Sequence, residues 1–468
     1  DVYKRQVQWT IFIWLCSLCV LSAQTLRERL DALVQSASVL QRSEVGITVF
    51  DLTEGTSLYQ YQADKLYRPA STEKVITAVT ALARLGENYC FRTHLSYTGT
   101  LCQDTLKGNL YVAGGFDPEF TEEDLDRFAQ AVYDAGIRTI EGDLIGDVSL
   151  TDSVYWGPGW SWDDTPESFQ PYLSALMLNR GCIKITVTPQ SKGESPQVEV
   201  SPVSDYYTVD NQAKSYDATS GKLRITRDWL HNGNTIRISG NVTRQTTRVL
   251  NLYSSENFFL QTFRCRLREK GITLRAVSKG LCPSGTISLA VCSRPIDEVL
   301  KRALKKSDNL SAEALFHHVG IQEADTLYVG FEESQEAICQ FMKEEIGHLP
   351  ERYRIVDGSG VSLYNYVSPA LLLAYLKYAY YHAPVFQPFY EALPIAGIDG
   401  TLQGRMKKGK AFRNVRAKTG SVTGVSSLAG YVHASNGHML AFVIINQNVL
   451  KSREARSFQD KICEILAR

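Results

Sequence analysis

The sequence shows no excess of either charge, because 50 Lys and Arg residues balance 50 Asp and Glu residues. Nucleic-acid-binding proteins usually carry a basic excess or a basic stripe, so this balance excludes nucleic acid as the main expected partner. The sequence also has no internal repeat and no low-complexity tract, and its hydrophobic content of 44% is ordinary for a globular protein. Its length of 468 residues predicts two or three domains.

The N-terminal apolar run is also short for a helix that crosses a membrane. Lys4 and Arg5 precede an apolar stretch from Trp9 to Val20, which ends in small residues before Gln24. A membrane-spanning helix needs about 20 apolar residues. We therefore predict a secretory signal peptide over residues 1–23, cut after Ala23, that exports the protein to the periplasm or cell envelope. The alternative is an uncleaved anchor with loose membrane association.

The sequence has no cysteine and histidine spacing typical of a zinc site. His317 and His318, with Glu323 nearby, are interpreted as one face of a helix rather than as metal ligands, and no cofactor is expected. Eight cysteines remain outside the predicted signal peptide, and some of them can pair in an exported protein. Two pairs are close enough in sequence to close small loops, although the sequence does not decide the pairing: Cys90 with Cys102, and Cys282 with Cys292.

Both ends of the remaining chain carry hairpin patterns. Residues 45–61 alternate apolar and polar positions around a Glu54-Gly55 turn. Residues 426–446 do the same around Asn436-Gly437, which is a strong hairpin signal. An amphipathic helix is expected over residues 452–468, and a buried helix over residues 71–85 because both of its faces are mostly apolar. The ends of the chain are thus predicted to form one sheet covered by helices.

The middle of the chain has a different sequence pattern, which predicts short strands separated by Gly and Asp turns. Between residues 185 and 245 the sequence becomes polar and β-like, with few helix signals. We interpret the middle as an insertion between the two ends. The predicted division is a signal peptide (1–23), a discontinuous domain built from both ends of the chain (24–88 and 290–468), an inserted domain (89–184 and 246–289) and a nested small β domain (185–245).

The segment Ser71-Thr72-Glu73-Lys74 opens the predicted buried helix. A serine hydroxyl is a poor nucleophile until a base accepts its proton. A lysine three residues further on lies on the same helix face, and burial lowers the pKa of its amine toward that of a base active near neutral pH. The two-residue pattern alone is also compatible with an ordinary serine N-cap and a surface lysine.

Two further motifs follow in the order expected for one active site. Ser307-Asp308-Asn309 offers a hydroxyl that can relay a proton and an amide that can hold a peptide carbonyl. Lys418-Thr419-Gly420-Ser421 begins a strand, where a cation and a hydroxyl can bind a carboxylate. Gly420 permits close approach of substrate, and the N–H groups of Ser421 and Ser71 can stabilise an oxyanion. Each motif is also compatible with an ordinary turn, but the ordered set is typical of penicillin-binding proteins and class A β-lactamases.

With these motifs, the sequence resembles the low-molecular-mass class C penicillin-binding proteins, the D-alanyl-D-alanine carboxypeptidase/endopeptidase family. The resemblance covers nearly all of the chain beyond residue 23. The segments that carry it are LYVAGGFDP (110–118), PGWSWDD (158–164), SALMLN (174–179), VDGSGVS (356–362), VSP (367–369), LPIAGIDGTLQGR (393–405) and AKTGSVTGVSSLAGYV (417–432). The family often has Arg after its GSGLS segment, whereas this chain has Leu363.

The resemblance implies a fold and an activity. The implied fold class is α/β (α+β): a transpeptidase-like domain, with an antiparallel sheet flanked by helices, carrying two inserted β-rich domains. The implied activity is hydrolysis of the terminal D-Ala-D-Ala bond, or of D-Ala-diaminopimelate cross-links, in peptidoglycan stem peptides. The implied partners are those stem peptides and β-lactam antibiotics as covalent inhibitors; the oligomeric state is left open.

The resemblance also assigns roles to the motif residues. Ser71 is the acylated nucleophile with Lys74 as its base, and Ser307 and Asn309 relay the proton and contact the substrate carbonyl. Lys418 and Thr419 bind the terminal carboxylate. Asp164, chosen over Asp163, contacts the free amine of diaminopimelate.

Two other functions compete with this one. A β-lactamase needs rapid deacylation, usually assisted by a glutamate beside the site, and SALMLN contains none. A non-catalytic penicillin sensor or wall-binding module has no need of both Ser71 and Lys74. Three nearby tryptophans are expected to pack a domain junction rather than to form a sugar-binding platform: Trp156, Trp160 and Trp162.

Overall fold

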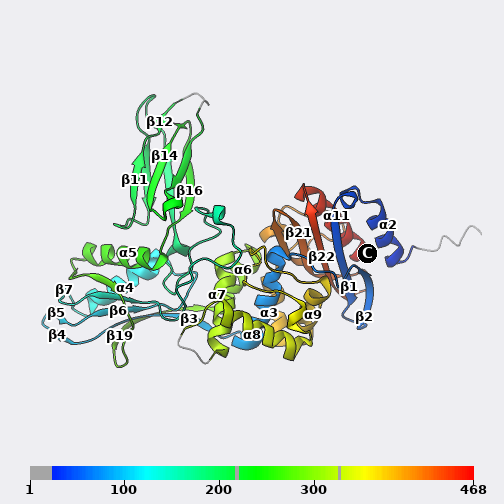
Figure 1. The fold of residues 1–468 in the computed structure, drawn as a ribbon, viewed down its shortest axis with the longest axis horizontal. Coiled ribbons are helices and arrows are strands. Elements are labelled where there is room, and N and C mark those ends of the chain that lie inside the picture. The colour runs from blue at the N-terminus through cyan, green and yellow to red at the C-terminus, as the bar shows by residue number, and fades with distance from the viewer. Residues whose placement is uncertain (1–23, 217–220, 325–327) are drawn as a thin grey trace, which may run out of the picture.

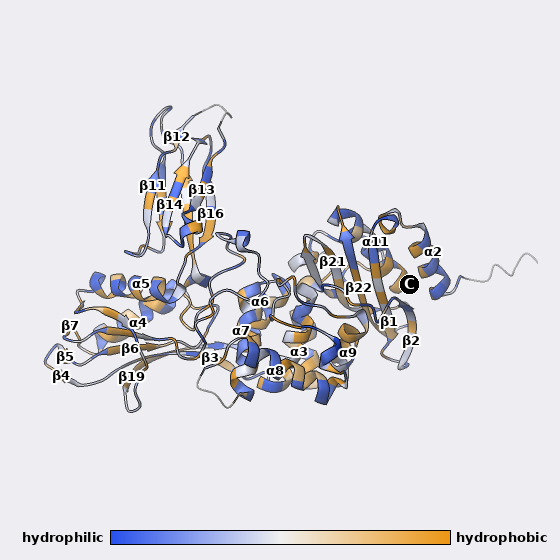
Figure 2. Ribbon diagram, viewed as in Figure 1, coloured by the Kyte–Doolittle hydropathy of each residue, from blue (hydrophilic) through white to orange (hydrophobic). Residues whose placement is uncertain are grey.

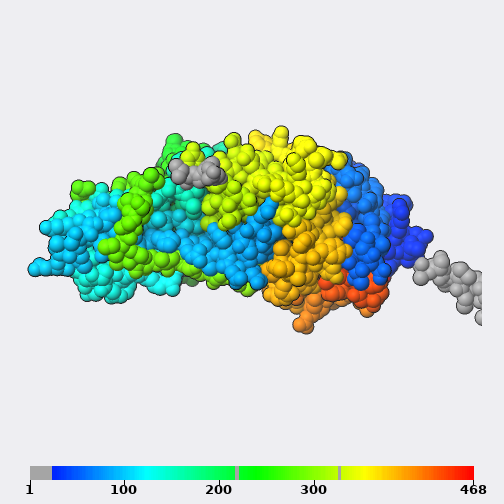
Figure 3. Space-filling view, turned by 90° about the horizontal axis from the view of Figure 1, so that it is seen from below, coloured from blue at the N-terminus to red at the C-terminus, as the bar shows by residue number. Residues whose placement is uncertain are grey.

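A computed structural model describes residues 24–216, 221–324 and 328–468 (Figure 1). The predicted signal peptide lies outside the described residues. Among the helices of those ranges, none has both the length and the apolar content needed to cross a membrane. The molecule is elongated, with a helix-rich end that contains α2 and α11 and an opposite end formed by the middle of the chain (Figures 1 and 3).

The helix-rich end is organised around a five-stranded antiparallel sheet with the order β2-β1-β22-β21-β20. The bounds are β1 (Glu44–Asp51), β2 (Thr56–Tyr61), β20 (Arg416–Val422), β21 (Gly424–His433) and β22 (Met439–Val449). Both predicted hairpins are present, because β1 pairs with β2 and β21 pairs with β22. Gly55 and Gly437 take positive φ values of 70° and 88° in the turns, which glycine adopts without steric cost.

Alternate residues of β22 face opposite layers of helices. Leu440, Phe442 and Ile444 pack with one cluster, which includes residues of α2 (Leu26–Ser36) and α11 (Ser452–Leu466). Val443 and Ile445 pack with the larger cluster on the other face. Side chains alternate in this way because successive strand residues point to opposite faces of a sheet. The bounds of the helices in the larger cluster are α3 (Lys74–Leu85), α6 (Ile296–Lys305), α7 (Asn309–Glu323), α8 (Phe331–Phe341), α9 (Pro369–Tyr381) and α10 (Ala383–Ala392).

A second five-stranded sheet, of mixed direction, forms the opposite end of the molecule. Its order is β18-β8-β6-β3-β19, and a small sheet of order β17-β7-β5-β4 lies beyond it. Helices α4 (Glu122–Asp134) and α5 (Ser255–Glu269) share its hydrophobic cluster. The strand bounds are β3 (Cys90–Tyr97), β4 (Thr100–Cys102), β5 (Thr105–Lys107), β6 (Leu110–Ala113), β7 (Thr139–Ile140), β8 (Leu144–Asp147), β17 (Thr273–Leu274), β18 (Val277–Lys279) and β19 (Ile287–Pro295).

A small β module projects sideways from this end (Figure 1). It contains sheets with the orders β10-β9-β16, β11-β14-β13 and β12-β15. Strand β14 alternates hydrophobic and hydrophilic positions, so one of its faces is buried (Figure 2). The bounds are β9 (Cys182–Thr188), β10 (Gln197–Ser201), β11 (Thr208–Asn211), β12 (Lys214–Ser215), β13 (Arg224–Arg227), β14 (Thr235–Ser239), β15 (Asn241–Val242) and β16 (Thr246–Asn251).

These layers confirm the predicted fold class, a helix-covered antiparallel sheet with added β-rich parts. Eight short helical turns connect the described elements: η1 (Ser38–Gln41), η2 (Ala70–Glu73), η3 (Trp162–Asp164), η4 (Asn179–Gly181), η5 (Trp229–His231), η6 (Met342–Ile346), η7 (Pro350–Arg352) and η8 (Gly400–Leu402). Two of these turns contain predicted site residues, Ser71 in η2 and Asp164 in η3.

Candidate active site

Ser71 lies in the 3₁₀ turn η2, one turn before the start of α3. A 3₁₀ helix has three residues per turn, so residues i and i+3 stand directly in line. Lys74 Nζ accordingly lies 3.0 Å from Ser71 Oγ. Ala70, just before the serine, has a φ of 49°, an uncommon conformation for a residue with a side chain. The sequence predicted an α-helix here, and the tighter turn aligns the two side chains more directly.

Lys74 is buried and makes three hydrogen bonds. Its ammonium donates to Ser71 Oγ at 3.0 Å, to Asn309 Oδ1 at 2.9 Å and to the carbonyl of Ser359 at 2.7 Å. Burial lowers the pKa of Lys74 to about 8, against the opposing charges of Glu313 and Asp357. Near neutral pH, an appreciable share of this amine is therefore free to accept a proton.

The loop between α6 and α7 brings Ser307 and Asn309 to the same place. Asp308 caps α7 by accepting from the N–H of Ser311 at 2.8 Å, and this leaves Asn309 at the first helical position. The Asn309 side chain accepts from Lys74 and donates to the carbonyl of Phe169 at 2.9 Å. Ser307 has a φ of 58°, so it also sits in an uncommon backbone conformation beside the site.

Strand β20 closes the opposite side of the site and is the edge strand of its sheet. Lys418 Nζ donates to Ser307 Oγ at 2.7 Å and to the carbonyl of Thr419 at 2.6 Å. Burial, together with the charge of Lys74, lowers the pKa of Lys418 well below its usual value. Thr419 Oγ1 donates to Thr401 Oγ1 at 2.8 Å. The hydrogen bonds thus link Ser71, Lys74 and Asn309 on one side, and Ser307 and Lys418 on the other.

Gly420 explains how β20 approaches the serine so closely. A Cβ at this position would lie 2.1 Å from Ser427 Oγ and 3.0 Å from the backbone nitrogen of Ser71. Any side chain would therefore push β20 away from the turn that contains Ser71. Ser421 follows on the exposed edge, where its N–H group is the second predicted oxyanion donor.

Glu313 is an important residue of the site that the sequence prediction missed. Its carboxylate accepts from the N–H groups of Gly358 at 3.0 Å and Ser359 at 2.9 Å. It thereby holds the Ser359 carbonyl that accepts from Lys74. Burial raises the pKa of Glu313 to about 8. The available signal was that Glu313 is the single acidic residue of the helix pattern SAEALFHHVG.

Asp357 organises the same loop from the other side. Its carboxylate accepts from the N–H groups of Gly360 at 2.9 Å and Ser362 at 2.8 Å, and from Trp160 Nε1 at 2.9 Å. Asp357 belongs to the VDGSGVS segment, whose role the sequence did not indicate. Trp160 packs edge-on against Trp156 with ring centroids 5.5 Å apart. Both tryptophans pack with the larger hydrophobic cluster, whereas Trp162 has 67% of its surface exposed.

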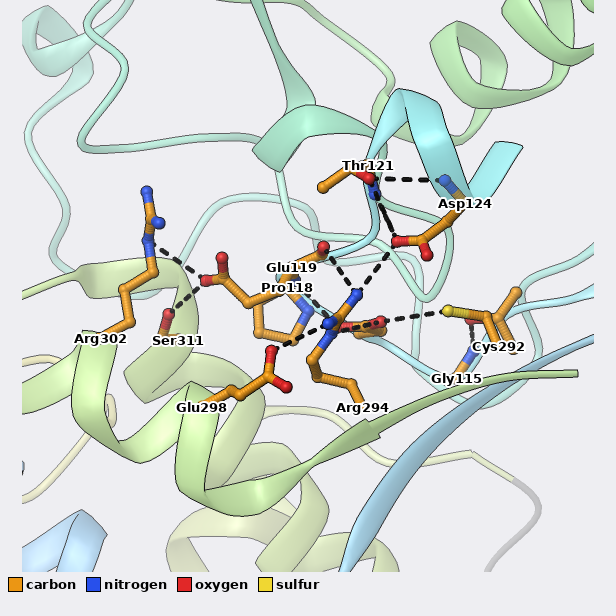
Figure 4. Close-up of polar contacts among 12 residues, drawn as sticks. Gly115, Pro118, Glu119, Thr121, Asp124, Cys292, Arg294, Glu298, Arg302 and Ser311 are labelled. Carbon is orange, nitrogen blue, oxygen red and sulfur yellow. Dashed lines mark hydrogen bonds and ion pairs between the residues drawn. The ribbon is translucent and has the colours of Figure 1, made fainter. Parts of the chain in front are cut away.

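A polar network joins the middle of the chain to helices α6 and α7 (Figure 4). Arg294 donates to Asp124 at 3.0 Å and to the carbonyl of Glu119 at 3.3 Å. The Glu119 carboxylate accepts from Ser311 Oγ at 3.3 Å and pairs with Arg302 at 3.2 Å. Residues far apart in the sequence are therefore tied to the helix that presents Asn309.

Arg180 extends this network to the motif loop itself. It pairs with Glu119 at 2.9 Å and with Asp308, the residue between Ser307 and Asn309. Burial alone would raise the pKa of Asp308, but the Arg180 guanidinium holds it below its usual value. Arg180 directly follows the SALMLN segment, yet nothing in the sequence pairs it with Asp308. It is a positioning residue for the loop.

Asp164 is not joined to the motif residues by any hydrogen bond within the described parts of the chain. It lies in η3, half-buried, and its backbone N–H donates to Ser161 at 3.2 Å. Burial and the neighbouring charge of Asp163 raise its pKa. The segment reaches the site a few residues later, where Phe169 and Gln170 contact Asn309.

His317 and His318 are core residues. His317 Nδ1 lies 2.9 Å from the carbonyl of Glu313, and His318 Nε2 lies 3.0 Å from that of Gly115. Burial lowers the pKa of His317 to about 4 and that of His318 to about 3, so both imidazoles are neutral. Neither suggested cysteine pair forms a disulfide, since the eight cysteines of the described chain are free thiols.

Glu73 is buried beside Lys74, and within the described chain neither of its carboxylate oxygens has a hydrogen-bond partner. Burial, with the charge of Asp357, raises the pKa of Glu73 well above its usual value. The folded protein therefore keeps a proton that the unfolded chain releases above about pH 4.5. Consequently, this residue destabilises the fold progressively as the pH rises above that value.

Glu73→Gln keeps the shape of the side chain and removes this penalty. We expect the variant to unfold at a temperature roughly 3 °C or more above wild type at pH 8. The difference should shrink toward zero as the pH falls below about 4.5, because the wild-type carboxyl then becomes neutral in the unfolded state as well. Calorimetry across this pH range checks the prediction, with the exposed Glu87→Gln as control. A difference that does not change with pH would contradict it.

A helix-covered antiparallel sheet, with a serine and a buried lysine at one edge and a Lys-Thr-Gly strand opposite, defines an active-site-serine hydrolase of the penicillin-binding type. The profile described as the D-Ala-D-Ala carboxypeptidase 3 (S13) family matches residues 26–468. The chain belongs to this family of serine-type carboxypeptidases, as the sequence motifs predicted.

Individual relatives agree with this assignment. A D-alanyl-D-alanine carboxypeptidase of Actinomadura sp. (strain R39) is 30% identical over 442 residues, which cover 90% of this chain and 80% of the relative. The D-alanyl-D-alanine carboxypeptidase DacB of Haemophilus influenzae is 29% identical over 411 residues, covering 86% of this chain and 85% of the relative. The crystal structure of penicillin binding protein 4 (dacB) from Haemophilus influenzae superposes with a TM-score of 0.83 at 26% identity, covering 94% and 99% of the two chains.

Proposed function

We propose that this protein releases the terminal D-alanine from peptidoglycan stem peptides through an acyl-enzyme on Ser71, and that it also cleaves D-Ala-diaminopimelate cross-links. The observation that carries the proposal is the 3.0 Å contact between Ser71 Oγ and Lys74 Nζ, an amine whose pKa burial lowers to about 8. A serine nucleophile needs such a base within hydrogen-bond reach.

In the proposed acylation step, neutral Lys74 takes the proton of Ser71 Oγ as the oxygen attacks the carbonyl of the penultimate D-alanine. The N–H groups of Ser71 and Ser421 stabilise the oxyanion. Ser307, which accepts from Lys418, passes its hydroxyl proton to the leaving amine and takes up the proton held by Lys74, so D-alanine departs and leaves Ser307 protonated and Lys74 neutral. Water then attacks the ester, with Lys74 again as base, and releases the shortened peptide and free Ser71.

Substrate recognition follows from the groups around the serine. Lys418 and Thr419 are proposed to bind the terminal carboxylate, or the carboxylate of a β-lactam that acylates Ser71 and blocks it. Asn309 is proposed to hold a substrate amide, since its side chain already lies between Lys74 and Phe169. Asp164 is proposed to bind the free amine of diaminopimelate. Residues 1–23 are proposed to direct export to the periplasm, where these substrates occur.

The alternative of a β-lactamase is less well supported. Among residues 165–179, Gln170 contacts Asn309 with its side chain, since Asn309 Nδ2 donates to Gln170 Oε1 at 3.3 Å. Gln170 carries an amide in place of a carboxylate, so it cannot act as a base for rapid deacylation. A non-catalytic sensor would not require the buried base of Lys74.

Labelling with a fluorescent penicillin tests the proposal on the purified protein without residues 1–23. Persistent label on Ser71, found by peptide mapping, together with release of D-alanine from a pentapeptide stem, is the expected result. Cross-linked muropeptides added in parallel test the endopeptidase activity. Rapid turnover of the penicillin would favour the β-lactamase, and lasting label without any peptide hydrolysis would favour the sensor.

A further inference from the structure

A cavity of about 720 Å³ lies between residues 163–167 and the projecting β module. One wall comes from Asp163 to Glu167, and the other from residues of β13, β15, β16 and the turn η5. Glu167 forms an antiparallel bridge with Leu250 of β16, so the two walls share backbone contacts. This volume is of the size that takes up a small ligand or one unit of a polymer.

A buried arginine fixes the geometry of the cavity. Arg227 has 1% of its surface exposed, and its guanidinium donates to Thr165 Oγ1 at 3.0 Å and to the carbonyl of Asn251 at 3.0 Å. It thus ties the 163–167 segment to β16 from behind. Because a buried charged group bonds to both walls, the shape of the cavity is preorganised before a ligand binds.

The cavity lining carries more cations than carboxylates. Arg248 pairs with Glu167. In contrast, Lys222, Arg224 and Arg244 have neither an ion pair nor a side-chain hydrogen bond within the described residues. The lining thus holds four cations against the two carboxylates of Asp163 and Glu167, so its net positive charge attracts an anionic ligand, and arginine suits carboxylates in particular.

The cavity also has an aromatic side. Trp229 lines it, and the Trp162 ring lies 5.2 Å from the Trp229 ring at an angle of 33°. Trp162 and the neighbouring Leu230 each have 67% of their surface exposed. The exposed Trp162 ring and the half-buried Trp229 ring offer flat apolar faces with a polar edge, which suit a ligand that has both apolar and polar sides.

The wall of the cavity continues directly into the active site. Four residues after Thr165, the carbonyl of Phe169 accepts from Asn309, and Gln170 also contacts Asn309. A ligand in the cavity therefore lies along the same chain segment that borders the catalytic groups. The cavity lining is nevertheless separate from Ser71, Lys74, Ser307 and Lys418.

We propose that this cavity is a second binding site for the peptidoglycan polymer, which holds carboxylate-bearing stem peptides and sugar rings next to the stem that is cleaved. The proposal rests on the proposed function, since it assumes that peptidoglycan is the substrate. The carboxylates pair with Arg224 and Arg244, and sugar rings lie against Trp162 and Trp229. The site then increases affinity for polymeric substrate without touching the reacting bond.

The test compares two double variants of equal charge change. Arg224→Glu/Arg244→Glu reverses two cavity cations, and Lys184→Glu/Lys214→Glu reverses two exposed cations of the same module outside the cavity lining. Co-sedimentation with purified insoluble peptidoglycan at fixed ionic strength measures binding. We expect the cavity variant to bind about tenfold more weakly than wild type, and the control to bind like wild type.

The same proteins are assayed on a soluble pentapeptide and for penicillin acylation. We expect wild-type rates for both variants, because neither small substrate reaches the cavity, while kcat/KM on the insoluble polymer falls only in the cavity variant. Trp229→Ala should reproduce the loss of polymer binding. The proposed binding site would be refuted if wild type and the cavity variant bound peptidoglycan equally, or if both double variants lost the same amount of binding. If wild type cleaves no peptide at all, the proposed function fails. Co-sedimentation still tests whether the cavity binds peptidoglycan, because it measures binding and not hydrolysis.

Discussion

Ser71→Ala is expected to lower kcat/KM for D-alanine release by about 10⁶-fold and to abolish penicillin labelling. Alanine removes the only atom that the proposed reaction esterifies and leaves the rest of the site unchanged. The backbone N–H of residue 71 and the Asn309 contacts persist, so the variant should still bind stem peptides. Residual hydrolysis would then reflect substrate positioning and oxyanion stabilisation alone.

The matched control is Ser57→Ala, an exposed serine of β2 at the other edge of the same sheet. It should keep wild-type labelling and hydrolysis. Rates are measured by D-alanine release from a pentapeptide, and labelling by mass spectrometry of the intact protein. Covalent penicillin on Ser71→Ala would show that another residue is the nucleophile and would refute the acyl-enzyme assignment.

Replacing Lys74 should have the next largest effect on the rate of acylation. Of two variants, Lys74→Arg tests the role of the base more specifically. Arginine keeps a cation near Ser71 but cannot release its proton at any relevant pH, so it cannot serve as the base. We expect acylation to slow by about 10⁴-fold. Lys74→Met should slow it similarly and also unfold more easily, because Asn309 Oδ1 and the Ser359 carbonyl lose their donor.

The pH dependence of wild-type acylation follows from the same group. The base must be neutral, and the pKa of Lys74 is lowered to about 8 by burial. Acylation by penicillin should therefore rise about tenfold per pH unit below this value and level off above it. Stopped-flow labelling between pH 6 and 9.5 checks the profile. A rate that is constant over this range, or an active Lys74→Arg protein, would contradict the role of Lys74 as base.

Much of the site was predictable because its signals are local. Ser71 and Lys74 are three residues apart. Short motifs of this kind can be identified from the sequence alone when they follow one another in the order typical of a family. The same holds for the two hairpins, whose turns at Gly55 and Gly437 need residues that accept a positive φ. In contrast, Glu313 acts through the N–H groups of Gly358 and Ser359, more than 40 residues further along the chain.

The sequence by itself determined the family and the helix-covered antiparallel sheet, and it predicted the catalytic motifs, because composition, periodicity and short motifs depend only on neighbouring residues. Only the tertiary structure decided which distant groups act on those motifs. Arg180 reaches Asp308 from another part of the fold, and Arg224 and Arg244 converge on a cavity that no stretch of sequence outlines. The pKa of Lys74 likewise depends on burial by several elements, and burial is a property of the packed chain rather than of any local pattern.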